Sequence, residues 1–175
     1  MSPDFAHRLR LDQIGERTQI DFAADDAERQ AVARRLGLES LDRFEGQAML
    51  SRDGDRIHAE GRVMASLTQG CVITGDPVAS AIDEAFAIDF IPEPKVGRAD
   101  EEIELAADDC DTVFHDGAAI DLGAAVVDTL ALALDPYPRS AGAKAALKEA
   151  GVLSEEEAGP FAALAALKDK LGNGS

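Results

Sequence analysis

The sequence is poor in the residues on which most catalytic and binding motifs depend. Its 175 residues include two cysteines, three histidines, one tyrosine and no tryptophan. It contains no GxSxG nucleophile elbow, Walker loop, GxGxxG dinucleotide motif or HExxH zinc motif. These absences argue against the common hydrolases and nucleotide-dependent enzymes. We therefore expect no cofactor and no small-molecule substrate.

Long apolar runs and a signal peptide are also missing. The longest apolar stretch, Leu122–Leu134, is interrupted by Asp128 and is shorter than the roughly 20 residues that span a bilayer. Met1-Ser-Pro-Asp lacks the basic start and apolar run of a signal peptide. The sequence therefore predicts a cytoplasmic protein without membrane contact, in which Cys71 and Cys110 are reduced thiols.

Basic charge is scarce and unevenly distributed. The chain has 17 Lys and Arg against 34 Asp and Glu, a net charge of −17. Residues 66–138 carry 2 basic and 16 acidic side chains, whereas residues 1–65 carry 10 and 13, and those 10 are all arginines. An acidic section of this size repels phosphate backbones. Bulk electrostatics thus argue against a general nucleic-acid-binding protein.

The clearest local prediction is a β-hairpin at Asp53-Gly54, the strongest sequence signal for a two-residue type I′ turn. Folding the chain there pairs Leu50 with Ile57 and sorts apolar from polar side chains, which fixes the register. The apolar face holds Phe44, Ala48, Leu50, Ile57, Ala59, Val63 and Leu67. The polar face holds Glu45, Gln47, Ser51, Arg56, His58, Glu60 and Arg62.

The remaining patterns complete an α+β domain with a mostly antiparallel sheet covered by two helices. The predicted strands are Phe5–Leu11, Thr18–Phe22, Val78–Ile91, with Asp83 and Asp89 on its wet side, and Thr112–Phe114. The predicted helices run from a cap at Asp25 or Asp26 to Gly37, and from a cap at Asp121 through Leu122–Leu134. Residues 95–111 are predicted to form a mobile acidic loop. Residues 1–138 would form the domain, and residues 139–175 an Ala-rich tail with a helix at Glu155–Leu171.

One arrangement could support catalysis. Cys110 and His115, with the carboxylates around them, can be drawn as a nucleophile and its base. Both lie in a stretch with little predicted structure, where a preorganised site is hard to build. A small cytosolic enzyme that uses these residues is therefore the alternative, and a non-catalytic binding protein is the favoured hypothesis.

Two segments about fifty residues apart resemble the YceD-like family of large ribosomal RNA subunit accumulation proteins. They are Gln69-Gly-Cys71-Val-Ile-Thr74-Gly-Asp-Pro77 and Ile120-Asp121-Leu-Gly-Ala-Ala-Val-Val-Asp-Thr-Leu-Ala-Leu-Ala-Leu134-Asp-Pro136-Tyr-Pro138. The family-motif residues within them are Cys71, Pro77, Asp121, Leu122 and Pro136. The resemblance implies a non-enzymatic ribosome biogenesis factor, needed for 23S ribosomal RNA to accumulate. It also implies that the gene often lies beside one for a small basic protein of the large subunit.

The resemblance carries no zinc site over to this chain. Family members commonly have a second cysteine three positions after the first, and some have a further pair near the chain's end. Here Thr74 stands at the second position and no cysteine follows Pro138. Zinc needs four nitrogen or sulfur ligands. We therefore expect no metal.

The resemblance and the charge together leave two candidate partners, a ribosomal protein of the large subunit and 23S ribosomal RNA. RNA would be contacted by the arginines Arg52, Arg56 and Arg62, together with Arg8 and Arg10. A basic protein would be bound by the acidic residues Asp100, Glu101, Glu102 and Glu104. The excess of 14 negative charges over residues 66–138 favours the basic protein.

Overall fold

A computed structural model describes residues 5–93 and 111–152 of the chain. The described parts of Met1–Gln69 and Ala79–Pro136 form one compact unit, and those of Gly70–Val78 and Tyr137–Ser175 form a second. The predicted helix at Glu155–Leu171 and the predicted loop up to residue 110 lie outside the described residues. None of the helices within the described ranges is long and apolar enough to cross a membrane.

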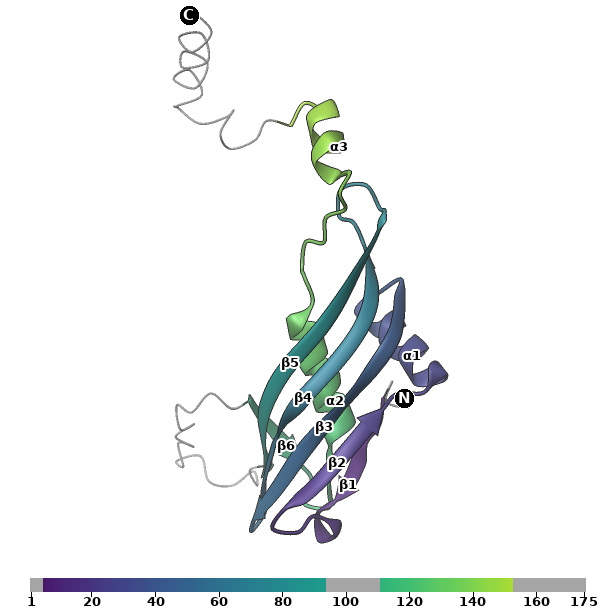
Figure 1. Ribbon diagram of the computed structural model, residues 1–175. Coiled ribbons are helices and arrows are strands. Elements are labelled where there is room, and N and C mark those ends of the chain that lie inside the picture. The colour runs from purple at the N-terminus through teal and green to yellow at the C-terminus, as the bar shows by residue number, and fades with distance from the viewer. Residues whose placement is uncertain (1–4, 94–110, 153–175) are drawn as a thin grey trace, which may run out of the picture. The chain divides into compact units, whose positions relative to one another are not determined.

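The first unit is built on a five-stranded sheet (Figure 1). Its order is β2 (Thr18–Ala23), β3 (Ser40–Asp53), β4 (Arg56–Gly70), β5 (Pro77–Pro92) and β6 (Asp111–His115). β2, β3 and β4 pair antiparallel, whereas β6 runs parallel to β5. The predicted α+β class and mostly antiparallel sheet are confirmed, but the parallel pair was not predicted. Parallel neighbours need a long connection, and residues 93–110 separate these two strands in sequence.

The central hairpin forms, but its register is shifted by two residues from the predicted one. Asp53 pairs with Arg56 and Leu50 with Ala59, so the turn is made by Gly54 and Asp55. Gly54 has φ of 61°, and no residue other than glycine has positive φ among those described. A type I′ turn needs positive φ at both positions, so this turn belongs to the II′ class, which has glycine first. The predicted sorting of apolar and polar side chains onto two faces is nevertheless observed, because a two-residue shift in register leaves each side chain on the same side of the sheet.

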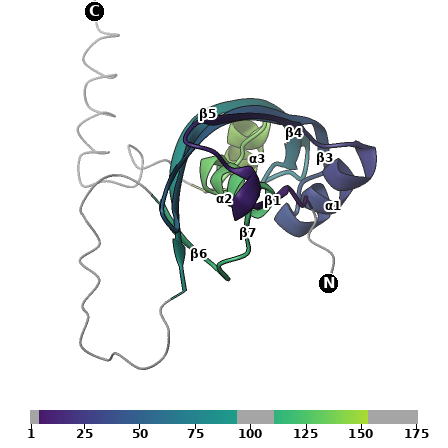
Figure 2. The same ribbon diagram turned by 90° about the horizontal axis from the view of Figure 1, so that it is seen from below.

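Two helices pack against the sheet as predicted. α1 (Asp26–Leu36) is capped by Asp25 in a capping box with Glu28, and it ends at Gly37 in the left-handed conformation with φ of 67°. α2 (Leu122–Ala133) is capped by Asp121. Their fully buried side chains include Val32, Leu122, Val126, Val127 and Leu130. Figure 2 shows the sheet arching over α2 and over a small second sheet.

A second, two-stranded sheet holds the N-terminal segment in place. β1 (Arg8–Arg10) pairs antiparallel with β7 (Ala119–Asp121), and a 3₁₀ turn at Leu11–Gln13 follows β1. The predicted strand at Phe5–Leu11 is therefore shorter than expected, and its long-range partner was not predicted. Phe5 enters the core, with its ring centroid 5.4 Å from that of Phe44 in an edge-to-face contact.

The described part of the second unit contains the turn between β4 and β5 and a short helix, α3 (Ala143–Glu149). This helix was not predicted. Gly142 precedes it and supplies no side-chain cap, so the sequence carries none of the usual signs of a helix start.

Candidate functional site

The Asp121-Leu-Gly family motif lies where α2 begins and fixes the N-terminal segment to the helix. The Asp121 carboxylate accepts hydrogen bonds from the backbone N–H of Ala124 at 3.1 Å and of His7 at 3.3 Å. The Leu122 N–H donates to the His7 carbonyl at 3.1 Å, and the Leu122 side chain is fully buried. Gly123 leaves no room for a side chain, since a Cβ there would lie 2.5 Å from backbone atoms of Phe5 and His7. This motif therefore has a structural role.

The Cys71 motif forms a tight turn in the second unit. Cys71 is only 4% exposed, and its Sγ accepts the N–H groups of Ile73 at 3.5 Å and Thr74 at 3.4 Å. The backbone N–H of Ser140 contributes most to stabilising the thiolate, the backbone N–H of Thr74 adds to it, and the pKa of Cys71 is lowered to about 6 although burial opposes this. Thiolate character at neutral pH follows from these donors. Pro77 opens β5 just after this turn, and Pro136 follows α2.

The groups that contact the Cys71 sulfur are hydrogen-bond donors and not metal ligands. The Thr74 hydroxyl donates to Asp76 at 2.6 Å and lies 3.1 Å from the Ser140 hydroxyl. Within residues 5–93 and 111–152, no group of three or more His, Cys, Asp or Glu side chains could hold a metal ion. The absence of zinc remains a prediction, which elemental analysis of the purified protein can test.

The arginines predicted to contact RNA do not share one surface. Arg52 lies opposite Ile57 in the β3–β4 ladder, and Ile57 is fully buried, so Arg52 is on the core side of the sheet. Its guanidinium donates to two backbone carbonyl oxygens, at 2.5 and 2.8 Å. Arg56 and Arg62 lie on the opposite, solvent-facing side. Arg8 and Arg10 belong to the small sheet.

Each of the four arginines other than Arg52 is ion-paired with a carboxylate. The pairs are Arg56 with Asp89, Arg62 with Asp83 at 2.8 Å, Arg8 with Asp116 at 3.7 Å and Arg10 with Asp12 at 2.7 Å. Each carboxylate cancels much of its partner's charge. The predicted basic patch is thus divided and largely neutralised.

Asp89 lies on the predicted polar side of β5, together with Arg56 and His58, but it is buried there, which was not predicted. It is only 6% exposed, and its carboxylate accepts hydrogen bonds from the Arg56 guanidinium and from His58 Nδ1, the latter at 2.8 Å. Burial raises the pKa of Asp89, but these hydrogen bonds outweigh it and hold the pKa below its usual value. The alternation of Arg56 and His58 along the neighbouring strand was the signal that could have revealed this cluster.

His115 is placed as a structural side chain and not as an accessible base. It is 6% exposed, and its Nδ1 accepts the N–H of Gly117 at 3.0 Å. The proton is therefore on Nε2, which donates to the Asp55 carbonyl at 2.7 Å. Nε2 thus ties the end of β6 to the hairpin turn, and Nδ1 holds the turn that follows β6. Cys110, the other half of the predicted catalytic pair, lies outside the described residues, as do Asp100, Glu101, Glu102 and Glu104.

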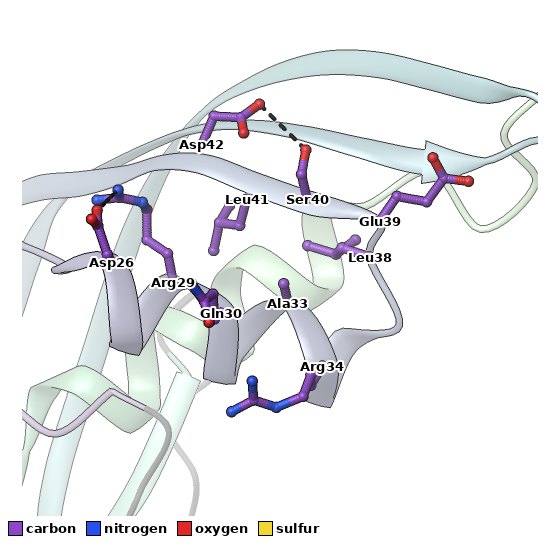
Figure 3. Close-up of a pocket in the computed structure, with 10 residues that line it drawn as sticks. All are labelled: Asp26, Arg29, Gln30, Ala33, Arg34, Leu38, Glu39, Ser40, Leu41 and Asp42. Carbon is purple, nitrogen blue, oxygen red and sulfur yellow. Dashed lines mark hydrogen bonds and ion pairs between the residues drawn. The ribbon is translucent and has the colours of Figure 1, made fainter.

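A shallow pocket of about 430 Å³ lies between α1 and the start of β3 (Figure 3). Asp26 and Arg29 form an ion pair on its wall, and Ser40 donates to Asp42 at 3.3 Å. Glu39 and Arg34 add one charge of each sign. These charges largely compensate one another, and the lining has no reactive group aimed at a common point. The pocket therefore gives no support to a catalytic site.

The family model described as Large ribosomal RNA subunit accumulation protein YceD matches residues 59–168, which is more than half of the chain. The matched region includes both segments that carry the Cys71 and Asp121 motifs. The description is that of an RNA accumulation factor and does not name an enzymatic activity. No curated protein and no solved structure matches the chain.

Proposed function

Because the chain belongs to the YceD family of large ribosomal RNA subunit accumulation proteins, we propose that it acts in assembly of the large ribosomal subunit by binding a basic protein of that subunit. Family membership implies a role in accumulation of the large-subunit RNA. The identity of the partner goes beyond what the family description states. It rests on how the charges of this chain are arranged.

The proposal rests on a difference in ion pairing between the arginines and the carboxylates of the chain. Seven of the described arginines form ion pairs with Asp or Glu: Arg8, Arg10, Arg29, Arg35, Arg43, Arg56 and Arg62. Several carboxylates, in contrast, are exposed and have no ion pair among the described residues, among them Asp21, Asp53, Asp55, Glu84, Glu93 and Asp111. Such a surface attracts a Lys- and Arg-rich partner and repels RNA.

The sequence of the acidic stretch supports the same choice. Asp100, Glu101, Glu102 and Glu104 add four negative charges within five positions. We assign part of the binding to them on charge alone. Direct RNA binding through Arg56 and Arg62 would bring phosphates next to Asp89 and Asp83, the carboxylates with which these guanidiniums pair. Catalysis by His115 would require it to leave the two backbone groups that hold both ring nitrogens.

The test is affinity purification of the tagged full chain from cells, with and without ribonuclease treatment of the extract. We expect a basic large-subunit protein to be retained at the same level after ribonuclease treatment. Changing the four acidic residues to Asn or Gln should lower its recovery and flatten its salt dependence, because fewer ion contacts form. Recovery that ribonuclease abolishes, and that Arg56→Ala with Arg62→Ala also abolishes, would show instead that the chain binds RNA.

A further inference from the structure

One edge of the five-stranded sheet is only partly covered. β6 pairs with β5 from Ile88, opposite Asp111, to Pro92, opposite His115. From Ala79 to Ala87, no described strand pairs with this edge of β5. Figure 1 shows β6 beside only one end of the long β5 strand. The backbone N–H and C=O groups of an uncovered edge are the template on which another strand can pair.

The side chains along this edge leave it open to approach. Small residues predominate over Ala79–Ala87, and most of this segment is exposed. The segment contains no proline and no lysine, the residues with which sheet edges are commonly protected. Its two charges are Asp83, which is paired with Arg62 across the sheet, and Glu84. The open edge therefore lacks proline and lysine, and its charges are two carboxylates, which would not exclude a basic strand.

A groove of about 420 Å³ runs beside the same edge, between β5 and the last turn of α2. Phe86 and Ala87 line it from β5, and Thr129 and Leu132 line it from α2. Leu132 is 81% exposed, on a helix whose other large side chains are mostly buried. An apolar side chain placed in this groove would bury Leu132. An open strand edge and an uncovered apolar side chain therefore occur at one place.

The charge of the groove identifies the class of the partner. Glu84 and Asp111 line it from two strands, both are exposed, and no basic side chain is among the described residues of the lining. Neither carboxylate has an ion pair among the described residues. Lys or Arg side chains of an added strand would meet both carboxylates, whereas a phosphate backbone would be repelled.

We propose that an extended basic segment of a partner protein adds as a strand to the Ala79–Ala87 edge of β5, with an apolar side chain against Leu132 and basic side chains at Glu84 and Asp111. Strand addition obtains its affinity from main-chain hydrogen bonds, and its specificity from pockets for alternate side chains. The inference rests on the proposed function, since it supplies the surface on which the basic protein is bound.

The test uses the full chain and two synthetic peptides. The first is a labelled nine-residue peptide of alternating lysine and valine, and the second has the same sequence with N-methyl groups on every other residue. The peptides have equal charge, but the second lacks the donors along one edge. We expect the first to bind by fluorescence anisotropy and the second to bind at least about tenfold more weakly, because the main-chain hydrogen bonds are lost. Hydrogen exchange of the amides of Ala79–Ala87 should slow when the first peptide is added.

A matched pair of charge variants locates the site. Glu84→Gln with Asp111→Asn should weaken binding of the first peptide by about fivefold, because both carboxylates line the groove. Glu16→Gln with Glu39→Gln makes the same change in net charge at exposed positions outside this groove. This control should alter binding by less than about twofold.

Several results would overturn the inference. Equal binding of both peptides would show that charge alone attracts them. In the peptide-free chain, slow exchange of those Ala79–Ala87 amides that do not point towards β4 would show that the edge is already covered. The cover would be residues 94–110 if the protection is independent of protein concentration, and a second copy if it rises with concentration. Protection of the same amides by single-stranded RNA, and not by the peptide, would assign the edge to RNA.

The inference and the proposed function can fail separately. A basic large-subunit protein retained after ribonuclease treatment, equally by the wild type and by the Glu84→Gln, Asp111→Asn variant, would refute the edge site alone. If no large-subunit protein is retained after ribonuclease treatment, the proposed function fails, whatever the peptides do.

Discussion

Replacing Gly123 with alanine should destabilise the first unit, although alanine is the better helix former. The new Cβ would lie 2.5 Å from the backbone nitrogen of His7, 2.5 Å from the carbonyl oxygen of Phe5 and 3.1 Å from the carbonyl carbon of Ala6. Favourable contacts need about 3.5 Å, so the N-terminal segment must move away by roughly 1 Å. This movement would strain the hydrogen bonds of His7 with Asp121 and Leu122.

The expected magnitude follows from three terms. Overpacking costs about 1–3 kcal/mol, and each weakened hydrogen bond adds up to about 1 kcal/mol. The gain in helix propensity from glycine to alanine offsets about 1 kcal/mol. We therefore expect a net loss of about 2 kcal/mol in the free energy of unfolding, or a fall in Tm of about 4–8 °C for a chain of this size.

Urea denaturation followed by far-ultraviolet circular dichroism can measure this, since the chain has no tryptophan. The matched control is Gly15→Ala, because the nearest atom to a Cβ there is the Thr18 hydroxyl at 3.8 Å. The control should lie within about 0.5 kcal/mol of the wild type. Equal stability of the two variants would refute the assignment of the Asp121-Leu-Gly motif to holding the N-terminal segment.

Three further predictions concern the hairpin, the thiol and the buried carboxylate. Gly54→Val should cost about 1–3 kcal/mol, because a β-branched residue resists φ of 61°, and unchanged stability would contradict the observed turn. In a Cys110→Ser background, absorbance at 240 nm should report ionisation of Cys71 with a midpoint near pH 6; a midpoint above 8 would disprove the thiolate environment. Because the folded-state pKa of Cys71 is lowered, its stabilising effect is present above the unfolded-state pKa and is lost as pH falls towards 6. Asp89→Asn should cost about 1–3 kcal/mol at neutral pH. Its effect should shrink only in acid, below the ordinary aspartate pKa, because the folded-state pKa is lowered; a constant effect across the acid range would contradict this.

Local sequence signals predicted the elements of the first unit well. The caps at Asp25 and Asp121, the left-handed Gly37 and the two faces of the central hairpin are all present. Each depends on residues a few positions apart, or on an alternation that burial enforces. The exact turn was missed because Asp53-Gly54 and Gly54-Asp55 give the same sorting of side chains.

The features that were missed depend on contacts between distant parts of the chain. Asp89 looked like a solvated strand residue, since its burial depends on Arg56 and His58. The pairing of β1 with β7 joins segments more than a hundred residues apart. The lowered pKa of Cys71 depends on Ser140, which no local pattern connects to it. The predicted boundary between residues 138 and 139 remains a prediction.

Depletion of the protein in the organism that encodes it tests the central claim most directly. The ratio of 23S to 16S ribosomal RNA should fall on depletion, and plasmid copies of the wild type and of the Glu16→Gln, Glu39→Gln control should restore it. A copy with Glu84→Gln and Asp111→Asn, together with neutral residues in place of Asp100, Glu101, Glu102 and Glu104, should restore it poorly at an equal protein level. An unchanged ratio on depletion would contradict the role in large-subunit RNA accumulation. Full rescue by the neutralised chain would contradict the claim that its carboxylates bind the partner.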